Sequence, residues 1–285
     1  MTRGAEEASK PPFAIGGLGG SGTRATAMLV RNCDCWIGGD LNDALDNLWY
    51  TFLFKRASVL TDSEARLNAL FSLFQARMQG EMPGPDTVQQ LTTLARQDRF
   101  GHSTEWLQAR LHSLSTASAE RPGGMRWGWK EPNTHIIIER LFRWAPNLKY
   151  VHVVRDPFYM ASSKNRNQLN NWGQLFLDRG LSLDRGLSGG ARDALAYWAA
   201  IHKRLEELSE HYPGRIMFFS HDGFMADPEP NAARLLDFLS LDPPANHRQL
   251  FEGINFRLTN RPEGAAAKAD PNDLAYCKDF AARFV

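Results

Sequence analysis

The chain has 285 residues, with 33 Lys and Arg against 32 Asp and Glu, which gives a formal net charge of +1. This balance lacks the basic excess typical of nucleic-acid and membrane-surface binders, and 43% hydrophobic residues are typical of a globular protein. No run approaches the roughly 18 apolar residues of a membrane span. Residues 1–12 are polar, without a signal-peptide pattern, and are predicted to form a flexible tail. Three cysteines are too few for a disulfide framework. We therefore expect a cytoplasmic protein with one domain over residues 13–285.

Short apolar runs alternate with helical patterns along the chain. Strands are predicted at residues 13–17, 36–39, 126–129, 148–154 and 215–219. Helices are predicted at residues 23–32, 132–144, 191–210 and 231–239 and after Pro157, and residues 41–120 are mostly helical with a break at 83–85. This alternation favours a single-domain α/β fold, with a mainly parallel central sheet flanked by helices.

Residues 165–190 are polar and glycine-rich, and they repeat the sequence Asp-Arg-Gly-Leu-Ser. This composition predicts a long mobile loop, and long loops in compact enzymes are often lids. The repeat is equally compatible with a neutral duplication.

A glycine-rich turn, Gly16-Gly17-Leu18-Gly19-Gly20-Ser21-Gly22-Thr23-Arg24, joins the first predicted strand to the first predicted helix. Glycines let backbone N–H groups approach an anion, and a helix N-terminus adds partial positive charge. A purely structural glycine turn is the alternative, but Ser21, Thr23 and Arg24 also suit oxyanions. We therefore predict a P-loop-like strand–loop–helix site for a phosphate.

The spacing of these glycines leaves the kind of nucleotide open. Gly17-x-Gly19-x-x-Gly22 matches the dinucleotide fingerprint, and Asp40 lies near the end of the second predicted strand, as in NAD(P)-dependent oxidoreductases. Gly17-x4-Gly22 also matches the start of an ATP-binding P-loop. That loop continues with Lys and then Ser or Thr, whereas Thr23 and Arg24 follow here, which disfavours an ordinary kinase or NTPase.

A second candidate phosphate contact follows the strand predicted at 148–154. Arg155 ends this strand, Asp156-Pro157 begins a helix, and Ser163 is expected about two turns into that helix. A strand-end Arg and a helical Ser can hold a phosphate from two sides, the Arg through bidentate charge-assisted bonds. A surface Arg beside a structural Asp-Pro turn is the alternative.

Together these segments resemble the sulfotransferases that use 3′-phosphoadenosine-5′-phosphosulfate (PAPS). The segment Gly20-Ser21-Gly22-Thr23-Arg24 is similar to the family loop that holds the 5′-phosphosulfate, and Arg155 with Ser163 is similar to the pair that holds the 3′-phosphate. Trp129-Lys130-Glu131-Pro132 resembles the family segment whose lysine lies near the transferred sulfuryl group. A late strand–turn–helix at residues 219–239 extends the resemblance, which covers residues 13–239.

The resemblance implies that residues 13–285 form a sulfotransferase domain. Its donor would be PAPS, its product 3′-phosphoadenosine-5′-phosphate (PAP), and its acceptor a hydroxyl or amine of a small molecule, glycan or lipid. No metal is implied. The expected donor contacts are Gly19, Gly20, Ser21, Gly22, Thr23, Arg24, Arg155 and Ser163.

One position departs from the family pattern, because many members begin the loop with Lys or Arg where this chain has Gly20. Arg24, Lys130 and the loop N–H groups are the candidates to neutralise developing charge instead. A nucleotide-binding module without catalytic activity is therefore the other alternative to the transferase, beside the oxidoreductase.

The resemblance also implies a general base after the first helix, where Asp40 and Asp43 lie. Asp40 is equally suited to cap the helix that follows it. The weaker candidates are His102, His112 and His135, while His152 alternates into a strand and is expected in the core or on a face of the sheet. Three tryptophans are expected to pack in the core or to stack on an adenine or a sugar: Trp127, Trp129 and Trp172.

Overall fold

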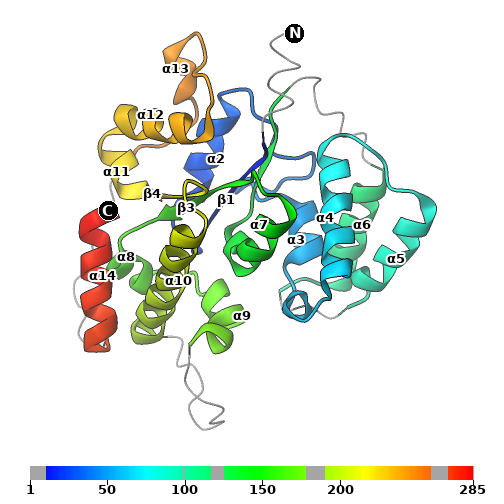
Figure 1. Cartoon of the computed structure of the whole chain (residues 1–285), viewed down its shortest axis with the longest axis horizontal. Helices are drawn as coiled ribbons and strands as arrows, with labels where there is room; N and C mark the ends of the chain where they lie inside the picture. Colours follow the sequence, from blue (N-terminus) through cyan, green and yellow to red (C-terminus); the bar gives the residue numbers. More distant parts are fainter. Residues whose placement is uncertain are drawn as a thin grey trace.

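The computed structural model describes residues 11–97, 99, 101–116, 125–177, 190–257 and 269–284. Its centre is a parallel sheet of β1 (Phe13–Gly17), β2 (Gly128–Lys130), β3 (Lys149–Val154) and β4 (Ile216–Ser220), in the order β2-β1-β3-β4 (Figure 1). In the register of this sheet, Ile15 of β1 lies opposite both Lys130 of β2 and Val151 of β3. The predicted α/β fold with a parallel central sheet is therefore confirmed.

Alternate residues of the strands contact different hydrophobic clusters, because successive side chains of a strand point to opposite faces. Phe13, Ile15, Val151 and Val153 pack with three helices: α2 (Thr23–Arg31), α11 (His221–Ala226) and α12 (Pro228–Leu239). The short α13 (His247–Leu250) adds Leu250 to this side. These helices therefore cover one face of the sheet.

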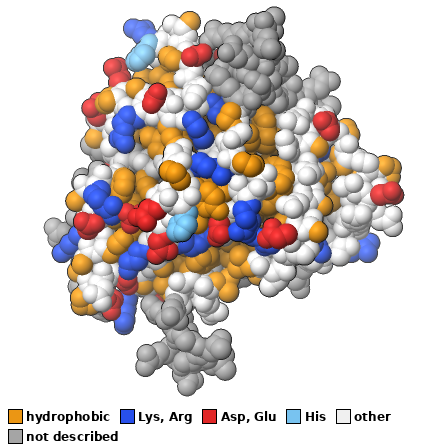
Figure 2. Space-filling view, viewed as in Figure 1, with side chains coloured by type: hydrophobic (Ala, Val, Ile, Leu, Met, Phe, Trp, Pro, Cys, Tyr) orange, Lys and Arg blue, Asp and Glu red, His pale blue; other side chains and the backbone are white. Residues whose placement is uncertain are grey.

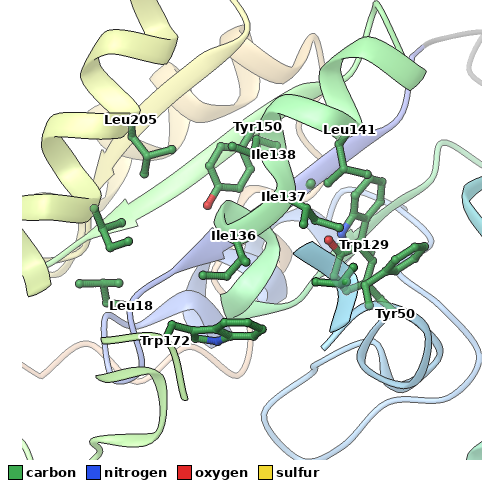
Figure 3. Close-up of a cluster of buried hydrophobic side chains, with 14 of the residues drawn as sticks. Leu18, Tyr50, Trp129, Ile136, Ile137, Ile138, Leu141, Tyr150, Trp172 and Leu205 are labelled. Carbon is green, nitrogen blue, oxygen red and sulfur yellow. The ribbon is translucent and has the colours of Figure 1, made fainter. Parts of the chain in front are cut away.

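The other face carries the larger cluster, which contains Ala14, Trp129 and Tyr150 (Figure 3). Six elements pack on this cluster: η2 (Pro132–Ile137), α7 (Ile138–Trp144), α8 (Pro157–Ser162), α9 (Asn167–Phe176), α10 (Ala191–His211) and α14 (Pro271–Phe284). One face of α10 is buried on this cluster through Leu195, Trp198, Ile201 and Leu205.

A group of helices lies beside the β2 edge of the sheet (Figure 1). It consists of α3 (Leu48–Phe54), η1 (Ala57–Leu60), α4 (Glu64–Met78), α5 (Pro85–Ala95) and α6 (Thr104–Thr116). Aromatic contacts join this group to the sheet, since the ring of Tyr50 stacks on that of Trp129 at 5.6 Å. The predicted helical region with its break at 83–85 is confirmed.

The predictions for two segments are wrong. Residues 36–39 form no strand, because only Trp36 pairs with the sheet, through a single bridge to Trp127. Residues 167–176 form α9 rather than loop, because one face of this polar segment, with Leu169 and Trp172, is buried. The helix predicted at 132–144 is confirmed at these bounds, with its first part, η2, in the 3-10 form and its second part, α7, in the α form. The repeated Asp-Arg-Gly-Leu-Ser sequence lies outside the described residues, as does the predicted N-terminal tail up to residue 10.

Basic and acidic side chains are interspersed on the face shown in Figure 2, in keeping with the balanced charge of the chain. Within the described ranges, no helix combines the length and the apolar character that crossing a bilayer requires.

Candidate functional site

The carboxyl ends of all four strands lead into polar segments. β1 ends in the glycine turn, β2 ends at Lys130, β3 is followed by Arg155, and β4 is followed by His221. The chain passes from β1 to β2 on one side of it, and then from β2 back past β1 to β3 on the other side. In open α/β sheets such a reversal creates a crevice at the carboxyl ends of the strands, where ligands bind. The glycine turn and Arg155 both lie at this position.

The glycine turn has the backbone of an anion cradle. Gly20 and Gly22 adopt left-handed φ angles of +92° and +90°, which side chains other than glycine rarely allow. Gly22 is the N-cap of α2. Because glycine has no side chain, this residue cannot accept a hydrogen bond from the first N–H groups of the helix. Ser21 is 1% exposed, and its Oγ has no hydrogen-bond partner. A buried hydroxyl beside uncapped N–H groups fits an oxyanion ligand.

Arg155 connects the glycine turn to β3. Its Nη1 donates to the carbonyl oxygen of Gly20 at 2.8 Å, and its guanidinium carbon lies 3.6 Å from the ring centre of Tyr159. Its Nε is 3.8 Å from Oδ1 of Asp222, a half-buried carboxylate whose pKa is raised by burial. Asp156 accepts from the N–H groups of Phe158 and Tyr159 at 2.8 Å, so it caps α8 as the Asp-Pro pattern predicted.

Ser163 lies at the C-cap of α8, not two turns inside a longer helix, because α8 ends at Ser162. Its Oγ nevertheless lies 3.5 Å from the point where a Cβ on Gly20 would stand, and it accepts from the N–H of Asn165 at 3.1 Å. The structure therefore brings Arg155 and Ser163 to the same residue of the glycine turn.

Two residues that sequence reasoning missed also contact this turn. The amide of Gln168 in α9 bridges it, since Oε1 accepts from the N–H of Gly19 at 2.8 Å and Nε2 donates to the carbonyl of Gly17 at 3.1 Å. The His221 imidazole packs against Gly22, and its Nδ1 is buried without a partner. Burial and the nearby Arg155 lower the pKa of His221 to about 4. No local pattern marked either residue, because each reaches the turn from a distant element.

Lys130 is buried at the end of β2, with 2% of its surface exposed. Its Nζ donates to a carboxylate oxygen of Asp46 and, at 3.0 Å, to the carbonyl of Ala44. It is therefore an oriented, ion-paired group and not a solvent-exposed lysine. Asp46 is the carboxylate that the structure brings to Lys130, and the sequence reasoning had singled out only Asp40 and Asp43 in this segment.

The remaining predicted catalytic residues make other contacts, although Asp43 directly precedes Ala44, whose carbonyl accepts from Lys130. Asp40 lies 3.3 Å from Nε of Arg110, and Asp43 is exposed. Because Asp40 follows no strand, the second half of the dinucleotide pattern is missing. Arg24 is exposed in the first turn of α2, next to the glycine turn, whereas Thr23 is buried there. The roles of these residues stay predictions.

The candidate histidines and tryptophans are mostly structural. His135 and His152 are fully buried, His102 stacks on Trp106 with ring centres 4.1 Å apart, and His112 is exposed. Burial lowers the pKa of His102 to about 4 and that of His135 to about 3. The core positions expected for His152 and for two tryptophans, Trp127 and Trp129, are confirmed. Trp172 is also buried, but it lines a cavity described below.

The sequence comparison assigns this arrangement to a family. The model of the sulfotransferase family matches residues 12–244, which include the glycine turn, Lys130, Arg155 and Ser163. No curated protein matches the chain significantly.

Three solved structures are similar to the chain at low identity. The sulfotransferase STF1 from Mycobacterium tuberculosis H37Rv is 18% identical, with a TM-score of 0.45, over 89% of this chain and 74% of that one. The sulfotransferase domain of the Synechococcus PCC 7002 olefin synthase is 16% identical, with a TM-score of 0.45, over 94% and 83%. The sulfotransferase domain from the curacin biosynthetic pathway is 16% identical, with a TM-score of 0.44, over 96% and 92%.

Proposed function

Because the chain belongs to the sulfotransferase family, we propose that it transfers a sulfuryl group from PAPS to a hydroxyl or amine of a small-molecule, glycan or lipid acceptor. The observation that carries this proposal is the meeting of two anion-binding features at one point. Arg155, which follows β3, lies 2.8 Å from the carbonyl of Gly20 in the turn that follows β1. One nucleotide with phosphates at two positions can engage both.

The residues present fit such a donor. The unpartnered hydroxyl of Ser21 and the uncapped first turn of α2 suit the 5′-phosphosulfate, with Thr23 and Arg24 beside them. Arg155 and Ser163 suit the 3′-phosphate, which distinguishes PAPS from ATP. Bound there, the donor would supply an activated sulfuryl group. Gly19 and Gly20 complete the turn through their backbone, which approaches an anion without hindrance from side chains.

Lys130 is proposed to stabilise the negative charge that develops during transfer, since Gly20 stands where many family members have Lys or Arg. Asp46 and the carbonyl of Ala44 hold its ammonium in place, so little reorganisation is needed in the transition state. Arg24 is the second candidate to stabilise this negative charge. Asp40 and Asp43 remain the proposed general bases for the acceptor proton.

Binding of PAP tests the proposed donor without knowledge of the acceptor. In titration calorimetry we expect PAP to bind at one equivalent and ATP and NAD to bind at least about tenfold more weakly, because neither places a phosphate on Arg155. Preferential binding of NAD would instead make Gly17-x-Gly19-x-x-Gly22 a dinucleotide site and would contradict the proposal.

Arg155→Ala tests the 3′-phosphate contact. Loss of charge-assisted hydrogen bonds is expected to weaken PAP binding by about 10- to 100-fold, or roughly 1.5–3 kcal/mol. Binding of 5′-AMP, which lacks the 3′-phosphate, should change little. The exposed Arg234→Ala in α12 serves as the control for a lost positive charge. Equal losses for PAP and 5′-AMP would remove Arg155 from the 3′ site.

Gly22→Ala tests the backbone of the turn. Gly22 has a φ of +90°, and a Cβ there would overlap the imidazole of His221. Strain of about 1–2 kcal/mol, together with this overlap, is expected to weaken PAP binding at least tenfold. Gly214→Ala is the matched control, because Gly214 has a φ of +74° but open space around it. The Gly214→Ala variant should bind PAP with the affinity of the wild type. Wild-type affinity in Gly22→Ala would contradict the role proposed for the turn.

A further inference from the structure

A cavity whose lining residues are mostly polar or charged lies beside α3, η1 and α9, outside the residues assigned to the donor. Its volume is about 580 Å³. Three cationic side chains line it, Lys55, Arg56 and Arg99, and no carboxylate is among the described lining residues. From α9 the lining includes Asn170, Asn171 and Trp172. The net charge of this cavity therefore depends on whether each of these cations forms an ion pair with a carboxylate elsewhere.

Arg56 forms a salt bridge, whereas among the described residues Lys55 and Arg99 form none, and the charge of Lys55 acts on the buried carboxyl of Glu131 without direct ion-pair contact. Arg56 pairs with Asp62 and donates to Oγ of Ser58 at 2.8 Å. Arg99 donates to backbone carbonyls instead, that of Phe52 and, at 3.1 Å, that of Leu94. Among the described residues, neither Lys55 nor Arg99 has a carboxylate within ion-pair distance.

Arg99 is half-buried without a carboxylate partner. Its Nε is buried and has no hydrogen-bond partner, and Oδ1 of Asn171, another lining residue, is likewise unpartnered. Burial and the neighbouring charge of Arg56 lower the pKa of Arg99 to about 10. A partly buried guanidinium without a direct counter-charge costs free energy, which an anion in the cavity would recover.

Hydrogen bonds connect the cavity wall to the end of β2. Nε1 of Trp172 donates to Oδ1 of Asn133 at 2.9 Å, and Nδ2 of Asn133 donates to Oε1 of Glu131 at 2.8 Å. Glu131 follows Lys130 directly. In Figure 3, Trp172 borders the same cluster as Ile136, which lies in η2 beyond Asn133. The cavity is thus anchored to the segment that carries the proposed catalytic lysine.

The cavity is also connected to the glycine turn. Gln168, one helical turn before Trp172 in α9, holds the backbone of Gly17 and Gly19. Arg155 and the proposed 3′-phosphate site follow β3, which lies on the other side of β1 from β2. A molecule in the cavity would therefore stand on the Lys130 side of the donor, where an acceptor must be.

We propose that this cavity binds an anionic group of the acceptor, a carboxylate or a phosphate, through Lys55 and Arg99. The substrate class is then a hydroxyl- or amine-bearing organic acid rather than a neutral alcohol. This inference rests on the proposed sulfotransferase function, because only that function makes the occupant an acceptor. Asn170 and Asn171 supply further polar groups beside the charged ones.

The test compares acids with their neutral amides on protein saturated with PAP, so that the donor site is filled. The probes are 4-hydroxyphenylacetate and 3-hydroxybutanoate, each beside its amide, with inorganic phosphate as a free anion. Calorimetry is expected to show binding of at least one acid about tenfold or more above its amide, the magnitude of a charge-assisted hydrogen bond.

Two substitutions assign that preference to the cavity. Lys55→Gln and Arg99→Gln should each reduce the acid-over-amide ratio by fivefold or more. Lys278→Gln, which removes an exposed lysine of α14, should leave the ratio unchanged. Lys55 is half-buried at the C-cap of α3, so its variant tests the proposal even where loss of Arg99 affects folding.

The outcomes separate the two proposals. Equal affinity for acids and amides, or no binding of any acid, overturns the anion site while PAP binding stands. Binding of phosphate without any acid-over-amide preference means a site for a free anion and overturns the acceptor assignment. If PAP does not bind and the protein still binds acids more tightly than their amides, the proposed anion site stands and the proposed PAPS donor is contradicted.

Discussion

Lys130→Ala is expected to lower kcat by about 100- to 1000-fold, the loss typical of removing one preorganised group that stabilises transition-state charge. PAP affinity should fall by less than about threefold, because the turn after β1 and Arg155 provide the donor contacts. The measurement is transfer of labelled sulfuryl from PAPS to an accepted hydroxyl compound, beside PAP titration of the same variant.

Two further variants interpret this result. Lys278→Ala removes an exposed lysine and should retain full turnover. Asp46→Asn leaves the ammonium of Lys130 with a weaker partner, so we expect an intermediate loss of kcat with KM nearly unchanged. Lys130→Ala with wild-type turnover would return this lysine to a structural role.

Lowering the pH from 7 to 4.5 is expected to destabilise the fold steeply through three core histidines. His135, His152 and His202 are at most 1% exposed, and their rings contact one another between η2, β3 and α10. Burial lowers the pKa of His135 and of His202 to about 3 and that of His152 well below its usual value. The folded protein therefore keeps all three neutral where the unfolded chain protonates them.

The sign follows from proton binding in the two states. Above an unfolded pKa of about 6.5 neither state binds these protons, and stability does not depend on them. As the pH falls below that value the unfolded chain binds more protons than the folded protein, so stability is lost until the folded pKa near 3 is reached. Each histidine adds up to about 1.4 kcal/mol per pH unit, or about 4 kcal/mol for three.

Urea unfolding from pH 7.5 to 4.5 measures this slope. His202→Phe replaces a ring that stacks on Trp198 with centres 3.7 Å apart. It should reduce the slope by about a fifth, because His102 and His221, whose pKa values are also lowered to about 4, contribute beside the three core histidines. His247→Gln removes an exposed histidine and serves as the control for loss of a histidine outside the core, so its slope should equal that of the wild type. Identical slopes in all three proteins would show that these histidines also charge within the fold.

The parts of the fold that local patterns encode could be predicted from the sequence. The β-branched run 148–154 and the glycine turn before residue 23 gave a strand, a loop and a helix where the structure has them. Residues 36–39 have a similar apolar pattern but form only one bridge to Trp127, because strand formation depends on a partner along the whole segment. The helix at 167–176 was missed because its buried face contains few apolar residues.

The residues of the candidate site likewise fall into those that a sequence motif marks and those that only the folded structure brings together. Arg155 and the glycine turn carry sequence motifs, so they were found before their geometry was known. The pair of Asp46 and Lys130, 84 residues apart, and the bridge from Gln168 to Gly19, 149 residues apart, depend on tertiary packing. The cations of the acceptor cavity, Lys55 and Arg99, likewise meet only in the folded chain. No spacing rule connects residues on separate elements of this kind.

The bridge formed by Gln168 has a consequence for the order of events in catalysis. Its Oε1 accepts from the N–H of Gly19, one of the groups expected to face a 5′-phosphate, so an arriving donor competes with α9 for that N–H. The same helix carries Asn170 and Trp172 into the acceptor cavity. Under the proposed assignments, occupancy of the donor site is expected to change affinity at the acceptor cavity through α9. Thermodynamic reciprocity then requires that the factor by which PAP changes acceptor affinity equals the factor by which the acceptor changes PAP affinity.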